Sequence, residues 1–237
     1  MHPRLLKFSL LFALLALLIA SCSKKESSPT EPEGPAPSIP VVTFKGPNTN
    51  SSDVQAMTVK SYVSAMNTYT MIFTPFMALQ GAQSGNTWTW TYTDRTLTVK
   101  FTATRQGDGS YTWKMVLNGT DPDNSAVVYN NWTAIEGTTS ADGKNGNWKI
   151  YEDNKTILAA EYIWTTSNNV LTGTLKVYSS GTLSDQTIVI NNPDGTGELR
   201  EYQGTILVFK AVWQANGSGQ WWTYNLSGQQ TGTGTWT

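Results

Sequence analysis

A chain of 237 residues with 16 Lys and Arg against 17 Asp and Glu carries almost no net charge, and its single His and single Cys lie within the first 22 positions. No basic cluster follows Lys24-Lys25, which argues against nucleic acid as a partner, because phosphate binding requires grouped Lys and Arg. A folded part without His or Cys lacks Ser-His-Asp and Cys-His catalysis and the usual zinc, copper and iron ligands, so we expect a non-enzymatic protein with no cofactor and no metal.

The first 22 residues predict an export signal. Arg4 and Lys7 give it a positive start, and a mostly apolar run of 12 residues follows from Phe8 to Ile19. A run of this length is too short to span a bilayer as a mature helix and is typical of a signal peptide. Its removal leaves 14 basic residues against 17 acidic ones.

The signal ends in Ile19-Ala20-Ser21-Cys22, which resembles the lipobox of bacterial lipoproteins. The resemblance implies cleavage before Cys22 and acylation of its thiol and new amino group. Several acyl chains anchor a protein stably, whereas one anchors it only marginally. Ser23 at the next position implies, by analogy with that family, the outer membrane of the cell envelope as the location. The alternative is an ordinary cleaved signal with a chance cysteine.

Residues 23–40 predict a disordered tether between the lipid and a folded domain at 41–237. The segment holds five of the ten prolines and almost no large apolar residue, so it cannot bury enough surface to offset its ordering entropy. As a semi-extended spacer it would reach roughly 50 Å from the membrane.

The domain begins with one predicted amphipathic helix over residues 53–74. Its apolar residues recur mostly every three or four positions: Val54, Met57, Tyr62, Met66, Tyr69, Phe73 and Phe76. Ser51 or Ser52 is the expected N-cap, and Pro75 should kink or end the helix near Phe73. We interpret the apolar stripe as a core-facing surface.

After Gly85 the chain predicts strands separated by Asp-Gly, Asn-Gly and similar turns. Eleven strands are expected, with a twelfth candidate at 231–236: 86–94, 96–105, 110–117, 126–133, 146–152, 156–165, 170–178, 185–191, 197–202, 205–214 and 219–225. Short loops leave no room for crossover helices, so the fold class is mainly β, an antiparallel meander.

Such a meander, apolar on one face, should curl into a barrel or a strongly curved half-barrel with the helix packed on its apolar side. This architecture loosely resembles lipocalin-like barrels and the periplasmic lipoprotein-carrier fold. A transmembrane barrel would show similar alternation, but a polar lumen would leave the amphipathic helix without a partner.

Two hairpins of the meander resemble each other. Residues 146–164 and 197–213 both run G-x-Trp/Leu-x-x-Tyr, a turn, Thr-Ile-Leu and Trp, and residues 219–224 begin the pattern again. Duplication or recurring hairpin chemistry would explain this equally well. The Thr-Ile-Leu strands are apolar on both faces, so their second face should be covered by the helix, a loop or another chain. Glu161 and Lys210 align there, which suggests an ion pair, with two separate solvated charges as the alternative.

The most unusual signal is the ten tryptophans. Trp88, Trp90 and Tyr92 lie on one parity of the segment TWTWTYTD, residues 87–94, and therefore on one face of a strand. With Trp113 they form either the apolar wall that the helix covers or part of a ligand-binding surface.

Trp221 and Trp222 are adjacent and must face opposite ways in a strand, so one of them should lie outside the main core. This pair is the better pointer to a binding surface.

Two acidic segments are weaker candidates. Asp121-Pro122-Asp123-Asn124 carries oxygen ligands as some Ca²⁺ loops do, but it lacks the remaining ligands and reads as a turn. Glu198 and Glu201 could be the paired acids of a glycosidase, but they lie beside a predicted turn, where solvated charge is the default.

These features favour a membrane-anchored, non-enzymatic lipoprotein that binds an apolar ligand such as lipid between helix and sheet. The alternatives are a surface glycan-binding protein that uses outward Trp and Tyr, and a structural or assembly lipoprotein without a small-molecule site. An internal cavity of at least about 300 Å³ would favour the first, and an exposed aromatic strip over a solid core the second. The sequence leaves the ligand and the oligomeric state open.

Overall fold

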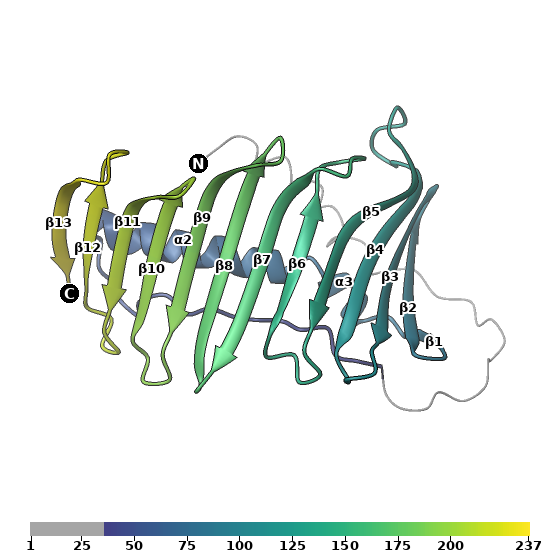
Figure 1. Ribbon diagram of the computed structural model, residues 1–237, viewed down its shortest axis with the longest axis horizontal. Helices are drawn as coiled ribbons and strands as arrows, with labels where there is room; N and C mark the ends of the chain where they lie inside the picture. The colour runs from purple at the N-terminus through teal and green to yellow at the C-terminus, as the bar shows by residue number, and fades with distance from the viewer. Residues whose placement is uncertain (1–35) are drawn as a thin grey trace.

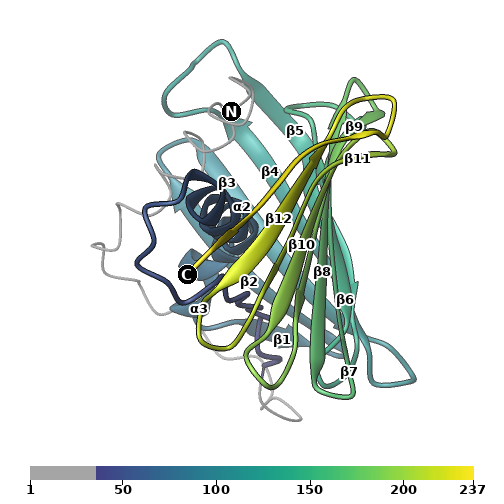
Figure 2. The ribbon, with the colours of Figure 1, turned by 90° about the vertical axis from the view of Figure 1, so that its left-hand side faces the viewer.

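The computed structural model describes residues 36–237 as one long, twisted sheet with a helix along one face (Figures 1 and 2). The predicted signal, the lipobox at Cys22 and residues 23–35 lie outside the described residues. The strands are β1 (Ala82–Ser84), β2 (Thr87–Asp94), β3 (Leu97–Arg105), β4 (Tyr111–Thr120), β5 (Val128–Thr139), β6 (Gly146–Tyr151), β7 (Leu158–Ser167), β8 (Val170–Ser179), β9 (Thr182–Asn191), β10 (Gly197–Gln203), β11 (Ile206–Trp213), β12 (Gly219–Tyr224) and β13 (Gln230–Trp236).

The 13 strands pair in chain order, and each pair is antiparallel. The predicted meander is therefore confirmed. β1 and β13 are opposite edges, so the sheet is open and a closed barrel is excluded. All eleven predicted strands and the twelfth candidate are present. The strand that sequence patterning missed is β1, whose three residues are too few to show alternation.

The helix α2 (Val54–Met71) begins one residue after its expected start. Its N-cap is Asp53, whose Oδ1 accepts from the backbone N–H of Gln55 and Ala56 at 2.8 and 3.0 Å. The expectation of a serine cap was wrong, because Ser51 Oγ instead accepts from the Asp53 N–H, at 3.2 Å.

The interruption at Pro75 is confirmed. The helix ends at Met71, and a short second helix, α3 (Thr74–Met77), carries the proline in its first turn. A proline there needs no N–H donor and so fits the start of a helix. Among residues 36–237 no helix is both long and apolar enough to cross a membrane.

The buried side of α2 differs from the predicted stripe at its start. Val54 and Met57 are 66% and 48% exposed, whereas Ala56 and Val59 are fully buried. Because α2 packs on a surface already filled by large rings, small and β-branched side chains provide the contact there. The later part of the stripe is confirmed by Phe73, which is fully buried.

Aromatic rings fill the space between the helices and the sheet. The Phe73 ring centroid lies 4.4 Å from that of Trp148 and 5.1 Å from that of Phe101, and Phe101 stacks on Trp113 at 5.3 Å. The core continues towards the N-terminus, where Ile39 and Phe44 are 7% and 2% exposed. Ile39 lies within the segment predicted as tether, so ordered packing begins before residue 41.

The tryptophans of this inner face lie beside residues with little or no side chain. Trp164 is directly opposite Gly146 on β6 and Gly173 on β8, and Trp213 is opposite Gly197 on β10 and Gly219 on β12. The indole of Trp164 spreads over Gly146 and that of Trp213 over Gly197, whereas Phe44 and Met66 fill the space at Gly173 and Trp236 fills that at Gly219. The glycines are therefore part of the packing.

The resembling hairpins share this arrangement. A turn glycine with positive φ comes first (Gly143, Gly195, Gly217), a strand glycine follows (Gly146, Gly197, Gly219), and a tryptophan on the next strand covers it (Trp164, Trp213, Trp236). The indole N–H of Trp164 and that of Trp236 donate to carbonyls of the corresponding turns, at 3.0 and 2.7 Å. The resemblance therefore reflects one repeated packing unit.

Gly197→Ala should destabilise the fold, because the added Cβ would lie 2.2 Å from Trp213 Cζ2 and 2.7 Å from the Ile190 carbonyl oxygen. Overpacking of this kind costs about 1–3 kcal/mol, or a fall in Tm of roughly 2–10 °C for a domain of this size. Gly107→Ala is the control, since nothing lies within 4 Å of its Cβ. Equal melting temperatures for the two variants would contradict the packing argument.

Candidate functional site

One face of the sheet points away from α2 and is here called the outer face (Figure 2). It is the second face of β7 and β11, for which the sequence predicted a cover. It carries half-buried apolar side chains such as Ile163 and Val212. No element of residues 36–237 lies over it in either view (Figures 1 and 2).

A ladder of alternating charges crosses the outer face from β4 to β8. Lys114, Glu136, Lys149, Glu161 and Lys176 are direct cross-strand neighbours in that order. Lys176 Nζ lies 3.0 Å from Glu161 Oε2. Opposite charges at such positions stabilise strand pairing, each by roughly 0.2–1 kcal/mol. The ladder leaves this part of the face nearly neutral.

Glu161 and Lys210 do not form the ion pair that their alignment suggested. Glu161 pairs with Lys176, while Lys210 Nζ lies 3.6 Å from Glu198 Oε1. β7 and β11 are separated by three strands, which places them roughly 19 Å apart. Equivalent positions of a repeat in a linear sheet are displaced along the sheet, so they cannot face each other.

Four tyrosines, here called the tyrosine row, lie on the outer face near the ends of the even-numbered strands β6 to β12: Tyr151, Tyr178, Tyr202 and Tyr224. Each follows a strand glycine by five residues, in the segments GNWKIY, GTLKVY, GELREY and GQWWTY. Sequence reasoning missed the second copy, because Asn168-Asn169 precedes it in place of an Asp-Gly or Asn-Gly turn. Tyrosines two strands apart are separated by roughly 10 Å.

The tyrosine row is stepped, and the pKa values of two of its members, Tyr151 and Tyr178, are raised. Gln186 pairs with both Lys176 and Tyr202, so the row moves by two residues between β8 and β10. The Tyr151 hydroxyl donates to Glu136, and burial, followed by that carboxylate, raises the pKa of Tyr151 to about 12. Burial, followed by Glu161, also raises the pKa of Tyr178. These phenols therefore remain able to donate hydrogen bonds at neutral pH.

Glu198, Arg200, Lys210 and Trp222 form a second feature of the outer face, here called the Trp222 cluster. Arg200, Lys210 and Trp222 are direct neighbours across β10, β11 and β12. Arg200 Nε donates to Glu198 Oε1, and this hydrogen bond raises the pKa of the guanidinium. Lys210 Nζ lies 5.7 Å from the centroid of the Trp222 ring, within cation–π range.

The remaining aromatic residues singled out from the sequence lie on the inner face. Trp88, Trp90 and Trp113 are 4%, 3% and 2% exposed, and Tyr92 is half-buried on the same side. They form the wall that the helices cover, one of the two expected arrangements. Trp221 also packs against this core. Trp222 is thus the member of the adjacent pair that lies outside it, as the parity argument predicted.

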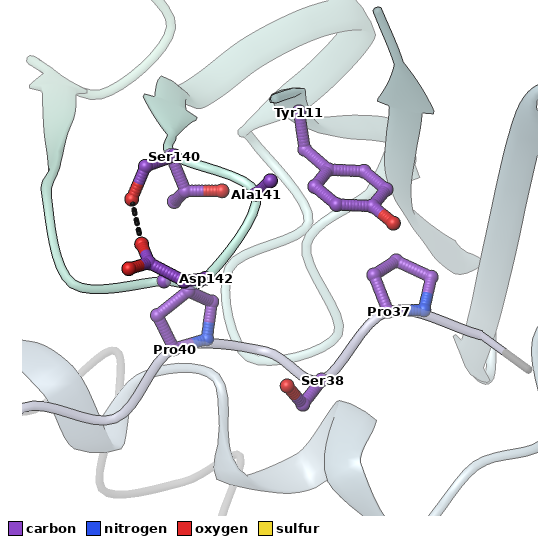
Figure 3. A pocket seen from close by; sticks show the side chains of 9 residues that line it. Pro37, Ser38, Pro40, Tyr111, Ser140, Ala141 and Asp142 are labelled. Atoms are coloured by element: carbon purple, nitrogen blue, oxygen red, sulfur yellow. Dashed lines mark hydrogen bonds between the residues drawn. The ribbon is translucent and has the colours of Figure 1, made fainter. Parts of the chain in front are cut away.

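A small hollow lies where β4 begins and β5 ends, beside the N-terminal segment (Figure 3). Its volume is about 100 Å³, and Pro37 and Pro40 face Tyr111 and the turn around Asp142 across it. Asp142 Oδ1 accepts from the Ser140 hydroxyl at 2.6 Å. Ligand pockets measure about 300–1,000 Å³, so this hollow is the contact of the N-terminal segment with a turn.

The acidic loop behaves as a turn. Asp121 Oδ1 accepts from the backbone N–H of Asp123 and Asn124 at 2.8 and 3.2 Å. Arg95 donates to Asp123 Oδ1 and to the Pro122 carbonyl, at 3.2 and 2.8 Å. Within residues 36–237 no group of three or more His, Cys, Asp or Glu residues is arranged to bind a metal ion.

Glu198 and Glu201 lie on opposite faces of β10 and cannot act as a catalytic pair. Glu201 is only 7% exposed and accepts a 2.5 Å hydrogen bond from Thr187 Oγ1. Burial, and to a lesser degree Asp185, raises the pKa of Glu201 to about 7, against the lowering effect of the Thr187 hydrogen bond. The expectation of solvated charge at Glu201 was wrong, because the Glu201 side chain lies on the face of β10 that is turned towards α2.

Comparison with known proteins adds no family. No protein-family model matches the chain, and no curated protein matches it either. The functional proposal therefore rests on the arrangement of side chains on the outer face.

Glu201 should make stability depend on pH. Its pKa is about 7 when folded against an ordinary value of 4.5, so the folded state binds the proton more tightly. The contribution of Glu201 to stability is greatest below about pH 4.5 and falls as the pH rises through 7, by up to about 3 kcal/mol. Glu201→Gln should remove this slope in urea unfolding at pH 5 and 8.

Thr187→Val provides the matched comparison. It removes the hydrogen bond that lowers the Glu201 pKa, so its stability should fall more steeply over the same range than that of the wild type. An unchanged slope in Glu201→Gln would show that another group titrates.

Proposed function

We propose that this protein is a lipid-anchored, non-enzymatic lipoprotein of the bacterial cell envelope, most simply of the outer membrane, that binds extended glycans on the outer face of its sheet. The observation that carries the proposal is the division of aromatic residues between the faces. The inner rings are packed against α2, whereas Trp222 and the tyrosine row lie on the face that no described element covers.

The chemistry of the outer face suits a sugar chain. A sugar ring has a flat C–H face that can pack on an indole or phenol ring, and hydroxyls at its rim that need hydrogen-bond partners. The Trp222 cluster supplies an indole beside Arg200, Lys210 and Glu198. The tyrosine row continues across β6, β8 and β10 at a regular interval, which fits an extended polymer better than a single small molecule.

An apolar ligand between helix and sheet, the first expectation from the sequence, remains a competing proposal. Phe73, Phe101 and Trp148 already pack together there with centroids 4.4–6.4 Å apart. A lipid would have to displace α2 and leave those rings exposed or newly covered. Native mass spectrometry of protein purified without added lipid separates the proposals, since a co-purifying lipid mass would support the apolar ligand.

Trp222→Ala should weaken glycan binding about tenfold, because an aromatic contact contributes about 1–1.5 kcal/mol. The measurement is retardation of the protein in native gels that contain soluble xylan, mannan, β-glucan or alginate. Tyr62→Phe, a conservative change on α2 at the other face, is the control. If no polysaccharide retards the wild type, a structural or assembly role replaces the glycan proposal.

Cys22→Ser should abolish acylation of the chain, because the lipobox resemblance places the lipid on the Cys22 thiol and amino group. The measurement is incorporation of an alkyne-labelled fatty acid in the native bacterial host, read out on the purified protein. Ser23→Ala, one position later, should keep the label. A labelled Cys22→Ser variant, or an unlabelled wild type, contradicts the anchor.

A further inference from the structure

The last strand of the sheet has an unguarded edge. Among residues 36–237, β13 pairs with β12 along one side and has no partner along the other (Figure 1). Its sequence, QTGTGTW, contains no charged residue and no proline. Natural sheet edges commonly carry Lys, Pro or inward charges that prevent pairing with another strand. The opposite edge differs, since β1 offers only three residues.

The inner side of β13 also lacks one element of a pairing pattern, in which Trp164 and Trp213 each have a glycine as partner on both neighbouring strands. Trp213 on β11 lies between Gly197 and Gly219 on its two neighbouring strands. Trp236 on β13 has Gly219 as its strand partner on one side and, among residues 36–237, no strand partner on the other, although its ring is only 3% exposed. A strand that supplied a glycine opposite Trp236 would complete the pattern.

We propose that a second copy of this chain supplies that strand, through antiparallel pairing of two β13 strands around a two-fold axis at Gly234. In this register Trp236 of each copy lies opposite Gly232 of the other. All residues from 231 to 237 find partners. The strand is therefore self-complementary under the pairing pattern that Trp164 and Trp213 follow.

The outer side of β13 is compatible with the same register. Thr233 of one copy lies opposite Thr235 of the other, so two pairs of small hydroxyl side chains meet, as Thr89 and Thr102 do in β2 and β3. Seven residue pairs extend over roughly 20 Å, and their interface is smaller than the about 1,200 Å² of a stable complex. The dimer should therefore dissociate on dilution, and a shared membrane anchor would favour it by raising the local concentration.

Charge substitutions on the outer side test both pairing and register. Thr233→Lys with Thr235→Lys places like charges directly opposite each other across the axis, twice, and should abolish the dimer. Thr233→Lys with Thr235→Glu places opposite charges there and should restore it, at least to the wild-type level. A register centred on Thr233 would instead oppose two lysines in both variants.

The measurement is sedimentation velocity of the full chain in detergent, over a concentration series up to about 0.5 mM, where weak complexes are populated. The thermal unfolding of each variant is recorded to confirm that it is folded. We expect a concentration-dependent dimer for the wild type and the lysine–glutamate variant, and monomer for the double lysine variant. A monomeric wild type, a dimeric double lysine variant or a monomeric lysine–glutamate variant overturns the proposal. If the edge of β13 pairs only with a strand of a different protein, the wild type will be monomeric.

Discussion

The placement of a tryptophan ring over a glycine on the neighbouring strand constrains the register of the strand pairs in this sheet. A Cβ added at Gly146, Gly197 or Gly219 would lie 2.1–2.4 Å from the opposing indole, so no other residue fits without movement. A slip of one residue would turn every side chain to the wrong face, and a slip of two away from the turn would bring Trp148, Leu199 or Trp221 under the ring. The register of a long, open meander is thus set by local steric fit.

The same constraint gives the two faces of the sheet different kinds of packing. Rings fill the inner face and leave α2 to cover them with small side chains such as Ala56 and Val59. The outer face has no such volume to fill, and its strands are matched by charge and hydroxyl pairs. The two segments that resemble each other therefore share one arrangement, with a tryptophan over a glycine on the inner face and polar side chains on the outer face.

Local sequence patterns predicted the helix and the strands, whereas the Trp222 cluster became visible only from the register of the strand pairs. Turn dipeptides and alternation located all strands except β1, and the break at Pro75 followed from proline geometry. The parity of Trp221 and Trp222 predicted that one ring lies outside the core, but its neighbours Lys210 and Arg200 are 10 or more residues away in sequence and depend on pairing. The buried position of Glu201 and the false pair of Glu161 with Lys210 also depend on where each residue lies in the sheet, which the turn and alternation patterns do not give.

Charge differs along the outer face in a way that bears on recognition. In the ladder from Lys114 to Lys176 each glutamate lies between two lysines, so a ligand meets little net field in its interior. At the Trp222 cluster one carboxylate, Glu198, neutralises only part of Arg200 and Lys210. A binding mode centred on Trp222 would then favour sugars with an acidic group, whereas the tyrosine row would contribute aromatic surface and length.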